Sequence, residues 1–416
     1  MTRANWDQKT AIQKVKEEYE EREPALQASY DRLLSAIKEK IADIQKQGPK
    51  YIPECDYTAL EENDGKVPAE LIERVKETGC LVIHNVIPSE EVLERKKEIQ
   101  EYWYGNQERA GVKARGVQNA LGLFKLREHP NLFKCIKAAN SLWHDSKGDT
   151  EWCPTKPMLY IDGCRIREPG TEGGMLAHVD SGGIERWWHP EYKKCYQPVW
   201  DGKWEELDSY DVAHRTTSVL PTNKLFRAFQ GWVAMSEAGV DKGTIRLCPM
   251  LKEGTAYYLL KQLLDKEMRA WPTVHSMSLR DELFPLINEG LVTIPDVQPG
   301  DFVLWHCDLG HSVEFTHNGD KDSSVAYIGA SPMCPMNAEY LVRQKETFRQ
   351  GGKGPDFVER DGDLGPEATF TDGRPTADDL SDIGKKMMGF APYECLAEDD
   401  EKIRAVTEKC NKILGF

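Results

Sequence analysis

Short runs of strand-forming residues, separated by glycine, proline and aspartate, fill the middle of this 416-residue chain. Each run is too short for a typical helix, and a few turn residues are enough to reverse an antiparallel strand. The pattern therefore predicts an antiparallel sandwich or barrel. The predicted strands are 158–166, 176–179, 229–236, 244–248, 291–294, 302–306 and 324–328.

Helical patterns flank this strand-rich region. Before it, residues 6–47 are highly charged, and Leu33, Ile37, Ile41 and Ile44 recur at helical spacing. We expect a helical hairpin there that packs on the main body or on another subunit. Between this arm and the strands, a helix is predicted over 68–78, a buried strand over 80–86, and a helix beginning at Ser89 as its N-cap.

The C-terminal region returns to helix and loop, and three parts of the chain can be distinguished. These are a helical N-terminal arm over 1–49, a β-rich core with a long insertion over 50–336, and C-terminal helices and a loop packed on the core over 337–416. Within the last part, helices are predicted over 337–350, 377–388 and 401–414.

The composition restricts the partners of the protein. Acidic residues outnumber basic ones by 69 to 54, a formal charge of −15, which opposes broad binding to nucleic acid or to anionic membranes. No apolar run is long enough for a transmembrane helix, and no secretory leader is visible. The 11 cysteines are scattered without a CxxC pair, so we expect reduced thiols in a cytoplasmic protein and no zinc–thiolate site.

The segment His178-Val179-Asp180 is a candidate metal site. In a strand, residues i and i+2 point to the same side, so this imidazole and this carboxylate can converge. Glycines on both sides allow the backbone to approach closely, including Gly173 and Gly174. A tripeptide of this kind is common by chance, and His306-Cys307-Asp308 is a second copy.

A second chemical segment lies downstream, where the turn Pro299-Gly300-Asp301 starts a strand that leads to His306 and then to His311. Two histidines and one carboxylate on strands form the facial triad of non-haem Fe(II) oxygenases, which leaves open positions for a co-substrate and O₂. Between the two segments, Arg246 is a cation within an apolar strand, which is costly unless it meets an anion.

The order of these motifs resembles the phytanoyl-CoA-hydroxylase-like Fe(II)/2-oxoglutarate oxygenases. Over roughly residues 66 to 390, it is most similar to the DUF1479 family (the YbiU-like proteins) within that group. The segments that carry the resemblance are 79–83, 178–180, 226–232, 243–247, 299–311, 334–337 and 373–376.

This resemblance implies a fold, a metal site and an activity. The fold is α+β, with a double-stranded β-helix (jelly-roll, cupin-like) core, surrounding helices and a helical N-terminal arm. The iron ligands fall on His178, Asp180 and His311, whereas His306 is a strand residue. The activity is that of an oxidoreductase, a dioxygenase that uses Fe(II), 2-oxoglutarate and O₂. Hydroxylation is the default outcome, and fungal members instead close an aziridine ring on a small amino acid such as valine.

The chain departs from the wider group at the arginine that usually follows the distal histidine by about ten residues. Only Lys321 lies there, within a predicted surface turn. We therefore expect another cation to hold the far carboxylate of 2-oxoglutarate. Arg246 is the first choice, because a bidentate guanidinium–carboxylate pair would justify its burial. Arg165 and Arg167, which share a strand face, are the second choice.

Three further residues are candidates for the substrate pocket: Trp188, which follows the metal segment, and Gln230 and Trp232, which share a strand face. For each of them, ordinary packing is the competing interpretation. We expect a small soluble substrate, with amino acids and similar small acids as first candidates, and a homo-oligomer is conceivable through the N-terminal helices. Two other classes stay open: a non-oxidative cupin-like isomerase or hydrolase that uses Zn or Mn, and a non-catalytic ligand-binding barrel.

Overall fold

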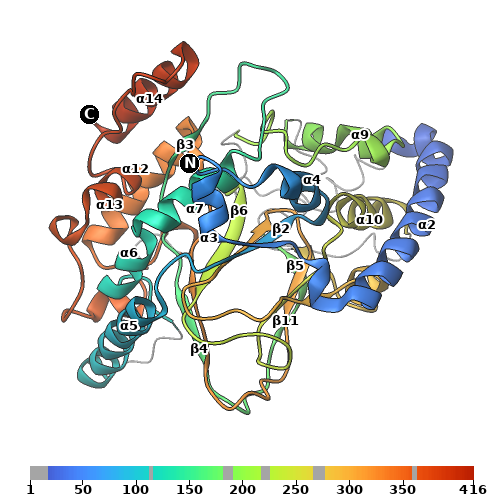
Figure 1. The fold of residues 1–416 in the computed structure, drawn as a ribbon. Helices are drawn as coiled ribbons and strands as arrows, with labels where there is room; N and C mark the ends of the chain where they lie inside the picture. The colour runs from blue at the N-terminus through green and yellow to red at the C-terminus, as the bar shows by residue number, and fades with distance from the viewer. Residues whose placement is uncertain (1–16, 112–115, 181–190, 217–224, 266–276, 358–362) are drawn as a thin grey trace.

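Two β-sheets lie at the centre of the computed structural model, with helices on the outside (Figure 1). The structure describes residues 17–111, 116–180, 191–216, 225–265, 277–357 and 363–416. The larger sheet has the strand order β1-β2-β10-β6-β12-β4, and the smaller one has the order β8-β5-β11-β7-β9. Apart from the parallel β1–β2 pair, all described strand pairs in both sheets are antiparallel, which agrees with the turn-rich sequence.

Most of the predicted strands are present with small differences at their ends. The exception is the run 158–166, where the chain forms β3 before it and β4 at its end, and residues 158–163 form no strand. A third sheet pairs β13 with β3. The strands are β1 (Glu54–Asp56), β2 (Cys80–His84), β3 (Cys153–Pro157), β4 (Cys164–Arg167), β5 (Met175–Val179), β6 (Phe229–Ala234), β7 (Ile245–Leu247), β8 (Met277–Ser278), β9 (Val292–Thr293), β10 (Phe302–His306), β11 (His311–Val313), β12 (Ser323–Tyr327) and β13 (Pro332–Met333).

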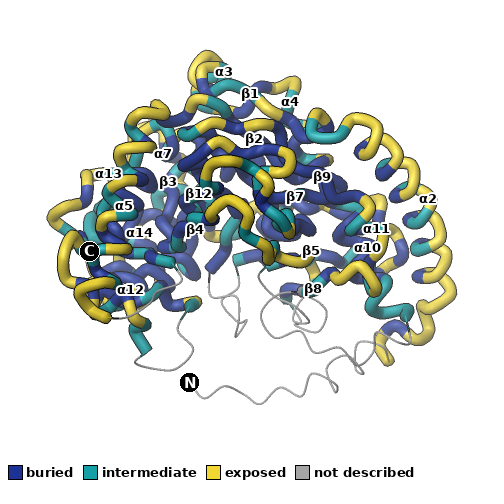
Figure 2. The backbone as a smooth tube through the Cα atoms, turned by 90° about the horizontal axis from the view of Figure 1, so that it is seen from below, coloured by how far each residue is buried: buried dark blue, intermediate teal, exposed yellow. Residues whose placement is uncertain are grey.

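The helices gather on two sides of the sheets. In Figure 1, α2 and α10 lie on one side, and α12, α13 and α14 lie on the other. Figure 2 shows that the central strands are buried and that the outer face of α2 is exposed. The helices are α2 (Glu23–Gln47), α3 (Tyr57–Glu62), α4 (Ala69–Thr78), α5 (Ser89–Ala110), α6 (Leu121–Arg127), α7 (Pro130–Asn140), α9 (Gln197–Trp200), α10 (Leu251–Leu264), α11 (Pro285–Glu289), α12 (Pro335–Arg349), α13 (Asp382–Met387) and α14 (Glu401–Leu414).

Helix α2 packs its apolar face on the body of the protein. Leu33, Ile37, Ile41 and Ile44, the residues with helical spacing, are all buried. Lys40 adds a half-buried ion pair to Glu253 at the start of α10, with an N–O distance of 2.7 Å. None of the described helices is long and apolar enough to cross a membrane.

One predicted helix cap differs from the structure. The N-cap of α5 is Pro88, and Ser89 is the first helical residue. The Ser89 hydroxyl donates to the carbonyl oxygen of Pro299 at 2.6 Å, so it ties the start of α5 to the turn before β10. Ser89 lies one residue too late in the chain to be the N-cap, and no side-chain hydrogen bond caps this end of α5.

Candidate metal site

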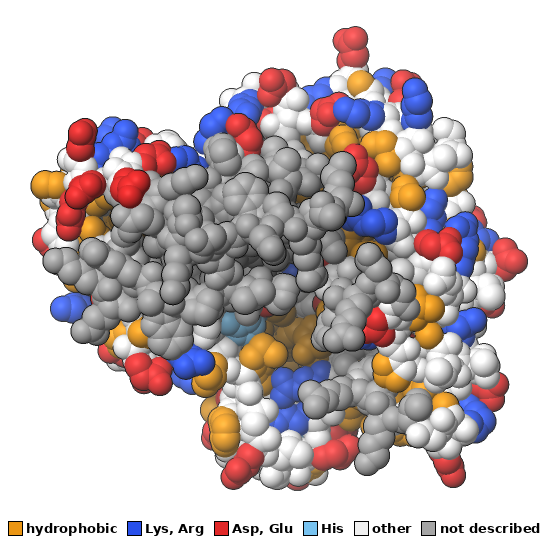
Figure 3. Space-filling model, turned by 180° about the vertical axis from the view of Figure 1, so that it is seen from behind, with side chains coloured by type: hydrophobic (Ala, Val, Ile, Leu, Met, Phe, Trp, Pro, Cys, Tyr) orange, Lys and Arg blue, Asp and Glu red, His pale blue; other side chains and the backbone are white. Residues whose placement is uncertain are grey.

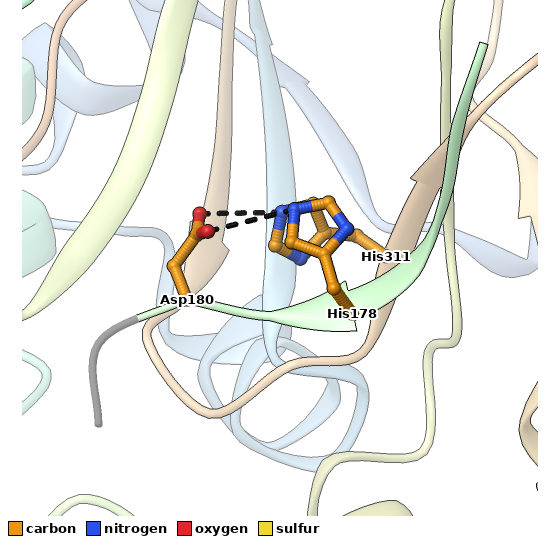
Figure 4. A group of neighbouring side chains, drawn as sticks. All are labelled: His178, Asp180 and His311. Atoms are coloured by element: carbon orange, nitrogen blue, oxygen red, sulfur yellow. Dashed lines mark ion pairs between the residues drawn. The ribbon is translucent and has the colours of Figure 1, made fainter. Parts of the chain in front are cut away.

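The two histidines of the site come from neighbouring strands of the smaller sheet. His178 on β5 and His311 on β11 are directly paired in the antiparallel register. Their ring centroids lie 4.2 Å apart, and Asp180 follows β5 immediately (Figure 4). The Nε2 atoms of His178 and His311 each lie 3.5 Å from a different carboxylate oxygen of Asp180. The structure therefore brings the three predicted ligands to one point.

Gly174 allows the two histidine strands to approach. A Cβ atom at this position would collide with the carbonyl oxygens of Val313 and Glu314, at the end of β11. Because only glycine lacks a Cβ, it permits this contact between β5 and the neighbouring chain. The glycine-rich flank is thus a condition for the pairing of the two histidines.

Backbone carbonyls determine which ring nitrogens face Asp180. Nδ1 of His178 lies 2.8 Å from the carbonyl oxygen of Leu176, and Nδ1 of His311 lies 2.9 Å from that of Leu309. A carbonyl can only accept, so each Nδ1 carries the proton and donates. Each Nε2 then bears a lone pair directed at the same point, the arrangement that a metal-binding histidine requires.

The surroundings of the site favour an ionised carboxylate at Asp180 and a neutral imidazole at His178. Burial raises the pKa of Asp180, but the contact with His311 and the nearby His178 and Arg227 outweigh it and hold this pKa well below its usual range. Burial and the charge of His311 lower the pKa of His178. Two neutral nitrogens and one carboxylate oxygen are a donor set that suits Fe(II). By this test, the three residues fit a resident divalent metal.

A cavity of about 270 Å³ opens beside the three ligands. Its walls come from both sheets, so it lies between them, and its size suits a small molecule rather than a polymer. On the face shown in Figure 3, hydrophobic and basic side chains and a histidine lie in a recess. The lining side chains used below are Tyr160, Asp162, Arg165, His178, Asp180, Arg227, Gln230, Trp232, Trp305, His311, Val313, Val325 and Tyr327.

Arg246, the preferred cation of the sequence analysis, is not among the lining residues. It pairs with Ser312 across the β7–β11 ladder, whereas Ile245 pairs with Val313 and both of these line the cavity. Successive residues of a strand face opposite sides, so Arg246 faces away. Its guanidinium donates to the carbonyl oxygen of Leu291 at 3.1 Å.

Arg165 does line the cavity. It pairs with Val325 of β12, and Val325 and Tyr327 also line the cavity. Arg167 is on the same strand face but is buried in backbone contacts. Its guanidinium donates to four carbonyl oxygens, those of Thr171, Gly243, Glu314 and Phe315. Arg167 therefore joins the ends of the two sheets.

Arg227 is a cavity cation that the sequence analysis did not single out. Its guanidinium lies over the Tyr160 ring, 4.7 Å from the centroid. Burial lowers the pKa of Arg227, but the neighbouring Tyr160 and the carboxylates of Asp180 and Asp162 outweigh it and raise this pKa. Burial raises the pKa of Asp162. The only sequence signal was position, because Arg227 lies three residues before Gln230 on the chain that enters β6.

The remaining predicted residues are placed as follows. Gln230 and Trp232 both line the cavity, and the Gln230 amide donates to Asp180 through Nε2. Trp188 lies outside the described residues. Lys321 is exposed and lies 3.3 Å from Glu237, as expected of a surface turn.

The second histidine–carboxylate group, His306-Cys307-Asp308, is fully buried. Nε2 of His306 lies 3.0 Å from the carbonyl oxygen of Ser209, and its Nδ1 accepts from the backbone N–H of Asp308. The Asp308 carboxylate lies 2.8 Å from Arg215 and also accepts from the Tyr196 hydroxyl. Both ring nitrogens of His306 contact backbone groups, so neither is directed at a metal position. We therefore interpret this group as a structural cluster.

The comparisons identify the family. A model of the Gig2-like family matches residues 7–390. The chain belongs to this family. The protein YbiU of Escherichia coli strain K12, which is uncharacterised, is 30% identical over 415 residues, and the match covers 92% of this chain and 97% of YbiU.

Two solved structures have the same fold. One is GlcNAc Inducible Gene 2 (GIG2, DUF1479) of Candida albicans, with a TM-score of 0.86 and 27% identity, covering 100% of this chain and 96% of that one. The other is a protein of Salmonella typhimurium LT2 proposed to be an oxidoreductase, with a TM-score of 0.84 and 28% identity, covering 93% of this chain and 98% of that one. The family is therefore the DUF1479 group that the motifs resemble.

Proposed function

We propose that the protein is an Fe(II)/2-oxoglutarate-dependent oxygenase that acts on a small acid. The observation that carries the proposal is the convergence of two lone-pair nitrogens and one carboxylate on the wall of a small-molecule cavity that also contains two arginines. The proposed oxidoreductase activity of the Salmonella relative agrees with it. The two facing sheets are consistent with a double-stranded β-helix core, which we propose as the fold class.

His178, Asp180 and His311 would hold the metal, and the carbonyls of Leu176 and Leu309 would fix the orientation of the imidazoles. When bound, Fe(II) supplies O₂ activation coupled to the decarboxylation of 2-oxoglutarate to succinate and CO₂, and thereby the power to oxidise a C–H bond. The chain itself orients both organic ligands and excludes water. Hydroxylation is the expected outcome, and ring closure is the alternative that the family resemblance adds.

Arg165 is our candidate for the far carboxylate of 2-oxoglutarate. It lines the cavity beside Tyr327, whereas Arg246 faces away from the cavity and Arg167 is held by backbone carbonyls. The Arg165 guanidinium can donate two N–H hydrogen bonds to a carboxylate, and the Tyr327 hydroxyl can donate a third.

Arg227 would then bind an anionic group of the primary substrate. It keeps its charge in a buried wall of the cavity and is held against Tyr160, so it is oriented in advance. A second cation beside the metal ligands favours a substrate that itself carries a carboxylate. This supports small acids, including amino acids, over neutral or polyanionic substrates.

The test is a turnover assay with purified protein. Fe(II), ascorbate, 2-oxoglutarate and O₂ are combined with panels of amino acids, hydroxy acids, acyl-CoA esters and oligonucleotides, and succinate is measured. We expect succinate only with Fe(II) and O₂, at a rate increased by one class of small acid, and none from the Asp180→Ala variant. No succinate under any condition, together with consumption of one added compound that Zn or Mn supports without O₂, would instead establish a non-oxidative metal enzyme.

A further inference from the structure

Gln230 presents its two amide ends to different neighbours. The Asp180 carboxylate can only accept, so the contact between the two side chains requires the Gln230 Nε2 end to face Asp180. This fixes the amide orientation, because the reverse orientation would place two acceptors together. Oε1 of Gln230 is consequently turned away from Asp180, and it is buried with no hydrogen-bond partner among the described residues.

Trp305 supplies an unpaired donor directly opposite. It pairs with Gln230 across the β10–β6 ladder, so the two side chains stand next to each other on the same face of the sheet. Its indole Nε1–H is also buried without a partner in the described part of the chain. Both residues are at least nine-tenths buried and both line the cavity, and the Trp305 ring lies 5.2 Å from that of His311.

A buried donor and a buried acceptor that both lack partners cost free energy unless a ligand or an ordered water satisfies them. A carboxylate can accept from Trp305 but has no hydrogen for Gln230, and an ammonium group can donate to Gln230 but cannot accept from Trp305. A hydroxyl does both through one oxygen atom.

We infer that Gln230 and Trp305 form a hydroxyl-binding subsite beside the metal ligands, so that the substrate of this site is a small acid that carries a hydroxyl group. The inference rests on the proposed function for the presence of a small acid in the cavity. It adds that a hydroxyl group of this acid lies next to the metal ligands. An empty subsite would hold a water molecule in the same place.

The affinity test uses the full-length protein freed of metal with a chelator, so that chelation of the metal by a hydroxy acid does not contribute. Calorimetry compares acids in pairs that differ by one hydroxyl, lactate with propionate and 3-hydroxybutyrate with butyrate. We expect the hydroxylated member of at least one pair to bind about tenfold or more tightly. In the Trp305→Phe and Gln230→Met variants, the ratio of the two dissociation constants within that pair should be close to one.

Trp204→Phe is the matched control. Trp204 also has a buried Nε1–H that finds no partner among the residues that the structure describes, but it does not line the cavity. The control loses the same N–H group and should keep the wild-type ratio. A ratio close to one for every pair in the wild type, no measurable binding of either hydroxy acid, or a Trp305→Phe variant that keeps the preference would each overturn the inference.

A high-resolution crystal structure of the metal-free protein gives an answer that does not depend on the choice of acid. We expect one oxygen atom, of water or of a soaked hydroxy acid, within hydrogen-bonding distance of both Trp305 Nε1 and Gln230 Oε1. If both atoms instead bond to protein groups, there is no subsite. Neither experiment requires turnover, so failure of the proposed oxygenase activity would be recognised separately by the succinate assay.

Discussion

At the scale of single residues, hydrogen bonds to ring nitrogens separate the histidines that can hold a metal from the one that cannot. His178 and His311 each use Nδ1 on a backbone carbonyl and turn Nε2 to Asp180. His306 uses both nitrogens within the protein. The strand spacing of His178 and Asp180 was enough to predict their convergence, but the sequence alone cannot show how a ring nitrogen is bonded.

The first prediction concerns these histidines. His311→Ala should remove most of the metal affinity, because it deletes one of the three proposed ligands. His306→Gln should still bind one metal per chain, but it should lower the free energy of unfolding by roughly 1–3 kcal/mol, because buried partners are left unsatisfied. Metal content and thermal unfolding of the two variants check this. A His306→Gln protein that is folded and metal-free would contradict it.

The second prediction separates the two arginines. Arg165→Gln should raise the apparent KM for 2-oxoglutarate strongly, since loss of one partner of a buried charge pair costs about 2–5 kcal/mol. Arg246→Gln is its control and should change this KM little, because Arg246 faces away from the cavity. Titration of 2-oxoglutarate in the succinate assay measures both. The reverse order of effects would return the role to Arg246.

At the scale of strands and helices, the alternation of side chains explains what the sequence could and could not predict. The sequence placed β5 and β10 almost correctly, because their hydrophobic runs and turns are local features, but β11, the short strand that carries His311, was not among the predicted strands. The sequence ranked Arg246 above Arg165 without showing which face of its strand each arginine occupies. That choice depends on which residues of β7 lie opposite Val313, and therefore on pairing between segments far apart in the chain. Arg227 was missed for the same reason, since its neighbours come from another part of the chain.

The third prediction concerns the contact between β5 and β11. Gly174→Ala should lower the free energy of unfolding by about 1–3 kcal/mol and weaken metal binding, because the added methyl group would push apart the strands that carry the two histidines. Gly254→Ala in α10 is the matched control, since its Cβ would meet only ordinary contacts. It should be neutral or slightly stabilising. Equal effects of the two substitutions would argue against a special role for Gly174.

The fourth prediction concerns a histidine that ties the strands of the larger sheet together. His84, at the end of β2, lies 2.8 Å from Asp301 and 3.0 Å from Glu54. The hydrogen bond to Asp301, with the bond to Glu54 and both charges, outweighs burial and raises the pKa of His84 from 6.5 to about 9. Because the folded-state pKa is the higher one, the stabilisation is fully present below pH 6.5 and is lost as the pH rises through about 9.

The His84→Gln variant should therefore lose roughly 1–3 kcal/mol of stability at pH 6 and much less at pH 10. Denaturant unfolding at a series of pH values measures this difference. His144→Gln is the control, because His144 meets Asp208 at an exposed position and such pairs contribute little. A stability difference between wild type and His84→Gln that grows with pH would contradict the sign of the argument.

At the scale of the whole molecule, helices cover the sheets that enclose the cavity beside the metal ligands. Helix α2 uses its apolar face against the body, and the described residues of α2 include no exposed large hydrophobic side chain. Homo-oligomer formation through the N-terminal arm remains a prediction. Because the exposed face of α2 is polar, such an interface would have to be polar as well. The acidic surface and the cavity of about 270 Å³ agree with a small substrate. The acidic character could be predicted from the sequence by counting charged residues. The cavity could not, because its size depends on how segments far apart in the chain pack together.

The central claim is that one metal held by His178, Asp180 and His311 binds 2-oxoglutarate in the cavity. The most direct test is an anaerobic calorimetric titration of 2-oxoglutarate into the Fe(II)-loaded protein, the metal-free protein and the Asp180→Ala variant exposed to Fe(II). We predict one 2-oxoglutarate per chain with Fe(II), and at least about tenfold weaker binding in the other two, because the keto acid then lacks its metal. Equal affinity in all three samples would contradict the account.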